Sequence, residues 1–261
     1  GLSAMLMKVI RELKPDYIAA AFDTKEPTFR HVAYKGYKAT RPEAEEDLKR
    51  QLARSHDVVE AFGIPALFKN GFEADDILGT VAEQTKKFKD LKVVIVSGDM
   101  DVLQLVDGDR VVVYTLRKGI EDTVIYNEDK AKERFGFPPG ALPDFKGLKG
   151  DPSDNIAGVR GIGEKTATEI IKNFGNLENL YNKVESGKLN LGGEKILKER
   201  IVQLLKDHKD DAIFSKNLAT IRKDVPISFS LPVSHFTLPA SKLKALFDEL
   251  GFSTLIARLE A

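Results

Sequence analysis

The sequence predicts an α/β fold, in which a mostly parallel, twisted sheet flanked by helices precedes a helical C-terminal part. Short apolar runs alternate with helical patterns as far as residue 126. The strongest of these runs are almost continuously apolar, as in strands buried on both faces of a parallel sheet. Only helical patterns follow residue 127. We therefore divide the chain into an α/β core over residues 1–126 and a helical part over residues 127–261.

The elements expected in the core follow one another in a regular order. Apolar residues at helical spacing predict a first helix over residues 2–13, and a buried strand over residues 17–22 stops on Asp23. The segment from about residue 29 to 54 is polar and rich in both signs of charge, so we predict a mobile arch there. The other expected elements are a helix over 73–88 and strands over 64–68, 93–97, 111–115 and near 124.

The second part is predicted to be helical and to contain a helix-hairpin-helix at about residues 145–175. Its glycine-rich segment is not a phosphate loop, because Glu164 separates Gly163 from Lys165. Gly161 and Gly163 allow a tight turn, and the helix that follows would present its N-terminal amides to a DNA phosphate. Lys165 and Thr166 would add contacts that carry no base information. A plain helix–helix turn is the alternative. The predicted helices cover residues 128–135, 140–148, 164–174, 177–184, 194–205, 209–220 and 240–250.

Composition limits the classes of function. The chain has 40 Lys and Arg against 40 Asp and Glu, so a polyanionic partner must be held by local basic patches. The absence of cysteine excludes thiol catalysis and zinc–thiolate sites, and four histidines leave few imidazole-rich metal sites. No apolar run approaches the roughly 20 residues needed to cross a bilayer. We therefore expect a cytoplasmic, nucleoid-associated protein that is a monomer and has no membrane partner.

Carboxylates follow the predicted strands at the points where the strands end. Asp23 follows the first strand, and Asp99 and Asp101 follow the strand over residues 93–97. The run Glu73-Ala74-Asp75-Asp76 opens a helix. Each acid alone has a structural explanation as a helix cap or a turn residue. Because the carboxyl ends of parallel strands face one crevice, however, we expect the acids to converge there.

Such a cluster needs a cation. Two like charges about 4 Å apart repel by about 4 kcal/mol at an effective dielectric constant near 20. With an all-oxygen ligand set, Mg²⁺ or Mn²⁺ fits better than zinc or copper. Two such ions about 3.5–4 Å apart can activate water and stabilise both oxygens of an in-line displacement at phosphorus. The expected chemistry is phosphodiester hydrolysis without a protein nucleophile.

These motifs together resemble the 5′ nuclease (5′-3′ exonuclease, or flap endonuclease) domain of bacterial DNA polymerase I, which has a PIN-like core. The resemblance covers nearly the whole chain and ends with Leu250-Gly251-Phe252. The matching segments occur in family order. They are Ala21-Phe22-Asp23, Phe29-Arg30-His31, Tyr37-Lys38-Ala39-Thr40-Arg41, Glu73-Ala74-Asp75-Asp76, Ser97-Gly98-Asp99-Met100-Asp101, Gly150-Asp151-Pro152-Ser153-Asp154-Asn155 and Gly158 to Ala167.

The resemblance implies two or more divalent ions in two clusters, and it assigns residues to them. The first cluster would use Asp23, Glu73, Asp75 and Asp76, and the second Asp99, Asp101, Asp151 and Asp154. The residues assigned to catalysis are Asp23, Asp99, Asp101, Lys38 and Arg41, the last two as cations that hold the scissile phosphate at the base of the arch. DNA contacts would come from Arg30, Lys38, Arg41, Gly161, Gly163, Lys165 and Thr166. The hairpin would also hold K⁺ through the carbonyls of Ala157, Val159 and Ile162, with those of Leu148 and Lys149.

The expected activity is cleavage at 5′ flaps and 5′ ends of branched duplex DNA, as in Okazaki-fragment processing and repair, with a polymerase domain following in the same chain. Family members begin with a strand that ends on an Asp-Gly-Asn type motif, and this sequence starts after it. We therefore expect the core to lack that strand and one ligand of the first metal. Two alternatives remain open at this point: a non-catalytic module that binds branched DNA, and a PIN-like ribonuclease.

Overall fold

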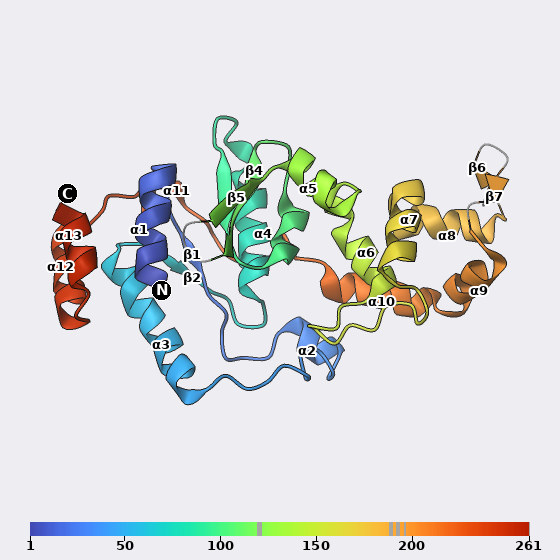
Figure 1. Cartoon of the computed structure of the whole chain (residues 1–261), viewed down its shortest axis with the longest axis horizontal. Helices are drawn as coiled ribbons and strands as arrows, with labels where there is room; N and C mark the ends of the chain where they lie inside the picture. Colours follow the sequence, from blue (N-terminus) through green and yellow to red (C-terminus); the bar gives the residue numbers. More distant parts are fainter. Residues whose placement is uncertain (119–121, 188–189, 192–193, 196, 261) are drawn as a thin grey trace.

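The computed structural model describes residues 1–118, 122–187, 190–191, 194–195 and 197–260. Figure 1 shows an elongated molecule with the strands of the first half of the chain near its middle, the helices of the glycine-rich part at one end and both chain termini at the other. None of the described helices is both long and apolar enough to cross a bilayer.

The α/β part contains short strands between helices. Its α-helices are α1 (Leu2–Leu13), α2 (Phe29–Ala33), α3 (Glu46–Ala61) and α4 (Ala74–Gln84), with short 3-10 turns at Thr85–Lys87 and Met100–Leu105. Its strands are β1 (Ala20–Ala21), β2 (Ala66–Leu67), β3 (Val93–Val96), β4 (Val111–Lys118) and β5 (Asp122–Tyr126).

Helices dominate the remainder of the chain. They are α5 (Glu128–Phe135), α6 (Leu142–Lys149), α7 (Glu164–Phe174), α8 (Leu177–Glu185), α9 (Glu199–Asp207), α10 (Lys209–Ala219), α11 (Leu231–Ser234), α12 (Ala240–Glu249) and α13 (Ser253–Glu260). A 3-10 turn at Pro139–Ala141 precedes α6, and two short strands pair antiparallel, β6 (Asn190–Leu191) and β7 (Glu194–Lys195). The helix predicted from residue 194 therefore begins at Glu199.

The mixed α/β arrangement confirms the predicted fold class, but the described strands are hydrogen bonded in separate groups. β1 pairs parallel with β2, whereas β3 pairs parallel with β4 and β4 antiparallel with β5. The strand predicted over residues 17–22 is therefore shorter than expected. Its first half pairs with a distant segment instead, since the Ile18 amide donates to the Ser234 carbonyl at 2.8 Å and Tyr17 bridges His235.

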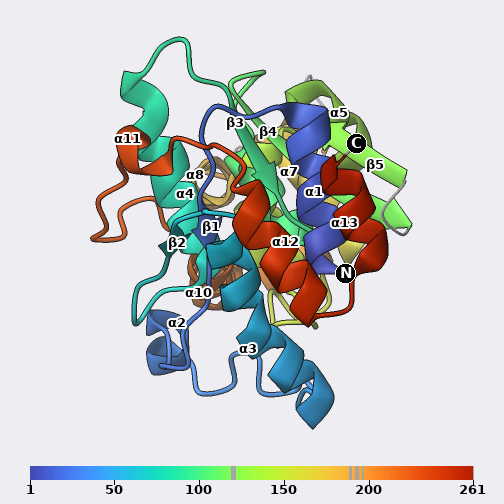
Figure 2. The same cartoon turned by 90° about the vertical axis from the view of Figure 1, so that its left-hand side faces the viewer.

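Two main hydrophobic clusters hold the described part of the molecule together, and a minor third one contains Tyr37 and Ile156. The larger joins β3 and β4 to α6, α7 and α8 through fully buried side chains such as Leu103, Leu148 and Ile170. The smaller joins α3 to α12 and α13 around Phe62 and Phe247. Figure 2 shows α12 and α13 beside α1, although almost the whole chain separates them in sequence. Both ends of the chain therefore stabilise the same end of the molecule.

Two tight approaches of the backbone shape the segment between α6 and α7. Gly150 and Gly158 have φ values of 79° and 63°, in the left-handed region that favours glycine. A Cβ atom on Gly158 would lie 2.2 Å from the Gly150 amide nitrogen and 2.7 Å from the Leu148 carbonyl oxygen. The Val159 amide also donates to the Leu148 carbonyl at 2.8 Å. The end of α6 is thereby fixed against the loop that leads into α7.

Candidate metal centre

The acids that follow the core strands meet in one place. The carboxylate of Asp23, just beyond β1, accepts a hydrogen bond of 2.8 Å from the Ala74 amide at the start of α4. Asp75 lies in the first turn of α4, and Asp99 and Asp101 lie where β3 ends. Burial, together with the charges of Asp99, Glu73, Asp101 and Asp23, raises the pKa of Asp75 to about 7. These carboxylates therefore form one electrostatic cluster.

A second group of acids lies next to the first. Asp101, Asp151 and Asp154 each offer an oxygen within 4.8 Å of the others, which is ligand spacing for a metal ion. Asp151 and Asp154 belong to the tight turn after α6, where the Asp151 and Ile156 backbones exchange two hydrogen bonds of 2.8 Å. Burial raises the pKa of Asp101 and the Lys146 ammonium opposes this rise. The charges of Asp99, from the first group, and Asp151, from the second, also raise it, so Asp101 connects the two groups.

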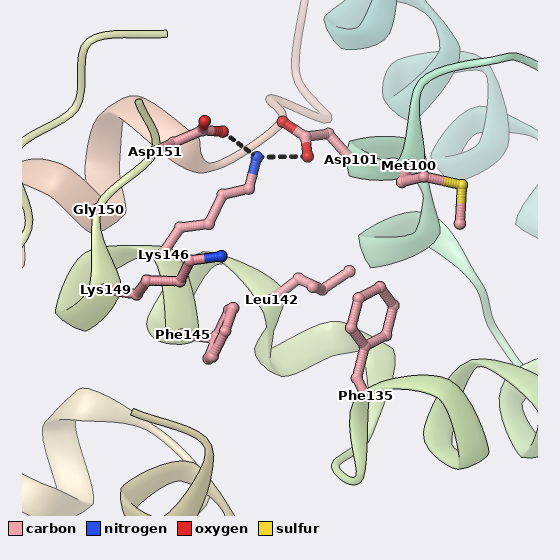
Figure 3. A pocket seen from close by; sticks show the side chains of 9 residues that line it. All are labelled: Met100, Asp101, Phe135, Leu142, Phe145, Lys146, Lys149, Gly150 and Asp151. Atoms are coloured by element: carbon pink, nitrogen blue, oxygen red, sulfur yellow. Dashed lines mark hydrogen bonds and ion pairs between the residues drawn. The ribbon is translucent and has the colours of Figure 1, made fainter. Parts of the chain in front are cut away.

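Lys146 of α6 supplies a cation at this second group. Its ammonium donates to the carboxylates of both Asp101 and Asp151, as Figure 3 shows. Burial alone would favour the neutral amine, but the two carboxylates outweigh it and raise the pKa of Lys146. Burial also opposes ionisation of Asp151, yet hydrogen bonds from Lys146 and Ser153 hold its pKa below the usual range. Lys146 is therefore a charged partner of both acids.

The residues between α2 and α3 bring a second set of cations to the carboxylates. Lys38 Nζ lies 2.6 Å from Glu73 Oε1, and Arg41 Nη2 lies 2.5 Å from Asp154 Oδ1. The hydroxyl of Tyr37, a buried residue, lies 3.1 Å from Glu73 and 3.2 Å from Asp154. Lys38 has a φ of 55°, and its amide donates to the Asp154 carbonyl. A non-glycine residue keeps such a strained backbone conformation only where surrounding contacts hold it in place, and such residues are frequent at functional sites.

Two residues assigned from the sequence lie in different surroundings from those expected. Asp76 is 0% exposed, and Arg30, at 2%, forms a two-pronged ion pair with it at 2.7 and 2.8 Å. Asp76 also accepts from the amides of Glu73 and Arg222. Neither of its oxygens is open to a metal, and Arg30 has no path to a DNA phosphate. We therefore correct both assignments: the pair joins α2 and α4 to the segment after α10.

Sequence reasoning missed Lys146 and the hydroxyl of Tyr37. The sequence identifies Tyr37 only as part of a motif. Lys146 lies five residues before Asp151 on a predicted helix, and a lysine on a helix that leads into an acidic turn is the signal that could have identified it. The partners of both residues come from several segments of the chain, which periodicity does not reveal.

The glycine-rich segment is arranged as a helix, a hairpin and a second helix. Gly163 is the N-cap of α7, and Gly161, with a φ of 94°, lies exposed in the preceding turn. Lys165 is exposed and Thr166 is half-buried in the first turn of α7, so both can reach a ligand at this helix end. The candidate K⁺ ligands extend from the last two residues of α6 to this turn. The Leu148 carbonyl accepts from the Val159 amide and the Val159 carbonyl from the Ile162 amide, while Ala157 is exposed.

Comparison with family models accounts for almost the whole chain. Residues 1–136 match the 5′-3′ exonuclease N-terminal resolvase-like domain, and residues 137–242 match the 5′-3′ exonuclease C-terminal SAM fold. The chain belongs to the 5′-3′ exonuclease family. The boundary between the two models lies ten residues beyond the division that we predicted at residue 126.

Relatives of this exonuclease chain include DNA polymerase I of Bacillus caldotenax, 36% identical over 262 residues, and DNA polymerase I of Bacillus subtilis strain 168, 38% identical over 260 residues. These alignments cover 100% and 99% of this chain but only 29% and 28% of the two polymerases. The chain therefore spans little more than a quarter of the length of these relatives.

Solved structures share the exonuclease fold at low sequence identity. A T5 5′-exonuclease with bound zinc is 21% identical, with a TM-score of 0.65 over 83% of this chain and 78% of its own. A T5 flap endonuclease in a pseudo-enzyme–product complex with DNA and metal ions has a TM-score of 0.65 at 20% identity, over 98% and 89% of the two chains. The catalytic core of Rad2 in complex with DNA substrate has a TM-score of 0.54 at 18% identity, over 94% and 78%.

Proposed function

We propose that this chain is a metal-dependent 5′ nuclease that hydrolyses phosphodiesters at 5′ flaps and 5′ ends of branched duplex DNA, in Okazaki-fragment processing and repair. The observation that carries the proposal is the joining of both carboxylate groups into one cluster, through Asp101, beside the basic residues Lys38 and Arg41. A nuclease needs this combination, because its metal ions and the phosphate to be cleaved must meet at one point.

The residues present fit divalent cations. Asp23, Glu73 and Asp75 would hold one ion, and Asp99, Asp101, Asp151 and Asp154 another, some of them through water. All these ligands are carboxylate oxygens, which Mg²⁺ and Mn²⁺ prefer. A cation would also relieve the repulsion that, together with burial, raises the pKa of Asp75 to about 7. When bound, the ions supply a nucleophile at neutral pH and neutralise charge that builds up on the phosphate.

The protein's own groups bind and orient the substrate. Lys38 and the half-exposed Arg41 would turn from their carboxylates to the oxygens of the scissile phosphate, which they hold in line. The segment between α2 and α3, which runs along the lower edge of the molecule in Figure 1, would be the arch that guides the single strand. The first turn of α7, with Lys165 and Thr166, would hold a phosphate of the duplex, and nearby carbonyls would hold K⁺.

We also propose that the chain acts as the 5′ nuclease part of a longer polymerase, because the relatives that it matches are far longer. Phosphate contacts that ignore bases predict recognition of DNA shape, strong dependence on salt and little sequence preference.

The test is cleavage of a labelled 5′ flap by the full chain in Mg²⁺ and in EDTA. We expect product only with metal, and we expect Asp99→Ala to abolish cleavage while flap binding persists, because the carboxylates set the rate and the hairpin sets the affinity. Undiminished cleavage by that variant would refute the assignment. Binding without cleavage by the unaltered chain would favour a non-catalytic module, and preferential cleavage of an RNA flap would favour a ribonuclease.

A further inference from the structure

Every carboxylate of the group formed by Asp101, Asp151 and Asp154 already has a donor from the protein. Asp151 Oδ1 accepts from the Ser153 amide at 2.9 Å and from the Ser153 hydroxyl at 2.7 Å. The other oxygen, Oδ2, lies 2.5 Å from Lys146 Nζ. Asp154 is paired with Arg41, and Asp101 with Lys146. Because Oδ1 already accepts two hydrogen bonds, a metal ion that binds through Asp151 has to approach Oδ2, where it meets the positive charge of the Lys146 ammonium.

The surroundings of Lys146 keep its ammonium in place. The Lys146 side chain is only 15% exposed, against 12% for that of Asp151 and 27% for that of Asp101. Figure 3 shows the lysine extending from α6 between the two carboxylates, above a cavity of about 180 Å³ whose lining includes Leu142 and Phe145. An enclosed ammonium exchanges carboxylate partners for water less readily than a surface lysine does.

We propose that Lys146 is a built-in competitor for the divalent cation at this group of acids. Without metal, its ammonium neutralises Asp101 and Asp151 and keeps the carboxylates together. When a metal binds, the ammonium must leave Asp151. This inference rests on the proposed metal-dependent function and deepens it, because it names the residue that sets how much divalent cation the second site requires.

The inference has a direct thermodynamic consequence. Binding of metal to the unaltered protein includes the cost of separating Lys146 from its carboxylates, and a variant without the ammonium avoids that cost. The same ammonium stabilises the metal-free protein, so its removal must cost more stability in EDTA than in Mn²⁺. A lysine that merely supported α6 by packing would change stability equally in both conditions.

The test is titration of Mn²⁺ into the full chain by isothermal calorimetry, without DNA. We expect Lys146→Met to tighten Mn²⁺ binding roughly ten- to a hundredfold, the range that follows when a hydrogen bond between charged groups need not be broken. Lys146→Gln is a second variant, which keeps a donor for one carboxylate and protects the test if Lys146→Met fails to fold. Thermal melts of each variant in EDTA and in Mn²⁺ provide the second readout.

Lys149→Met is the matched control. Lys149 is on the same helix and lines the same cavity, but its Nζ lies 3.1 Å from Glu164 rather than at the acids. We expect this variant to change Mn²⁺ affinity by less than about threefold, as for a partly exposed ion pair. If Lys149→Met tightened Mn²⁺ binding as much as Lys146→Met does, the effect would come from the loss of any nearby positive charge and not from displacement of Lys146. That result would overturn the inference.

The outcomes separate this inference from the proposed function. If the unaltered chain binds Mn²⁺ but the Lys146 variants bind it no more tightly, the competitor role is wrong and the metal-dependent function stands. If the unaltered chain binds no Mn²⁺ in the millimolar range, the proposed function and this inference fail together.

Discussion

Asp75 combines burial with the charges of neighbouring acids, and these raise its pKa to about 7. In the unfolded chain it titrates near 3.8, so between these values the folded protein binds more protons than the unfolded chain. Protonation of Asp75 therefore stabilises the folded protein fully below about pH 4, and this stabilisation is lost as the pH rises to 7. The carboxylate cluster thus destabilises the metal-free protein at neutral pH.

Asp75→Asn should accordingly stabilise the metal-free protein above pH 7, by on the order of 2 kcal/mol. The difference from the unaltered protein should shrink as the pH falls toward 4. Urea unfolding in EDTA at several pH values measures it. In Mg²⁺ the gain should disappear, because the variant loses a carboxylate ligand. A difference independent of pH would show that Asp75 does not titrate in this range.

The ion pair between Arg30 and Asp76 is buried. Without Asp76, Arg30 keeps only the longer contact of 3.3 Å with Glu73, and the amides of Glu73 and Arg222 lose their acceptor. We expect Asp76→Ala to cost about 3–5 kcal/mol of stability, equally in EDTA and in Mg²⁺. Asp151→Asn is the comparison, because it should instead reduce the stabilisation that Mg²⁺ provides. Thermal melts of both variants in the two conditions measure this. Loss of Mg²⁺ stabilisation by Asp76→Ala, without loss of stability in EDTA, would restore Asp76 as a ligand.

At the scale of elements, the hairpin between α6 and α7 depends on the approach of Gly158 to Gly150. Gly158→Ala places a Cβ atom 2.2 Å from a backbone nitrogen at a φ of 63°, so the loop must shift. We expect a loss of at least about 2 kcal/mol in stability and weaker binding of duplex DNA. Gly140→Ala is the control, because Gly140 is exposed and a Cβ atom there meets nothing within 4 Å. Equal stability of the two variants would contradict this account of the turn.

The sequence predicts elements better than it predicts contacts between them. The apolar run of β3 and the acids that follow it are local features, so the position of Asp99 and Asp101 at the strand end could be anticipated. The environment of Asp76 could not, because its partners Arg30 and Arg222 are 46 and 146 residues away. The strand over residues 17–22 was overestimated for a related reason, since hydrogen bonding with Ser234 replaces part of its sheet pairing.

At the scale of the whole molecule, α12 and α13 return to the end where the chain begins, and their side chains complete the core around α3. Phe62 and Phe247 are both 0% exposed, and their ring centroids lie 6.2 Å apart. Because α3 continues the proposed arch, its anchorage in this core fixes one end of that segment. The group of Asp101, Asp151 and Asp154 lies on the larger core and does not use these residues, whereas Asp23 follows β1, which packs against the smaller core.

Phe247→Ala should therefore loosen the arch from a distance. Removal of a fully buried phenylalanine costs about 3–5 kcal/mol, and we expect this loss to fall on the smaller core. Hydrogen exchange should show faster exchange in α1, α3 and α12, whereas β3, β4 and α6 keep the protection of the unaltered protein. Mn²⁺ affinity should stay within about twofold, because distant sites act independently. Uniformly faster exchange across both cores would show instead that the molecule unfolds as a single cooperative unit, and the arch would then have no separate anchor.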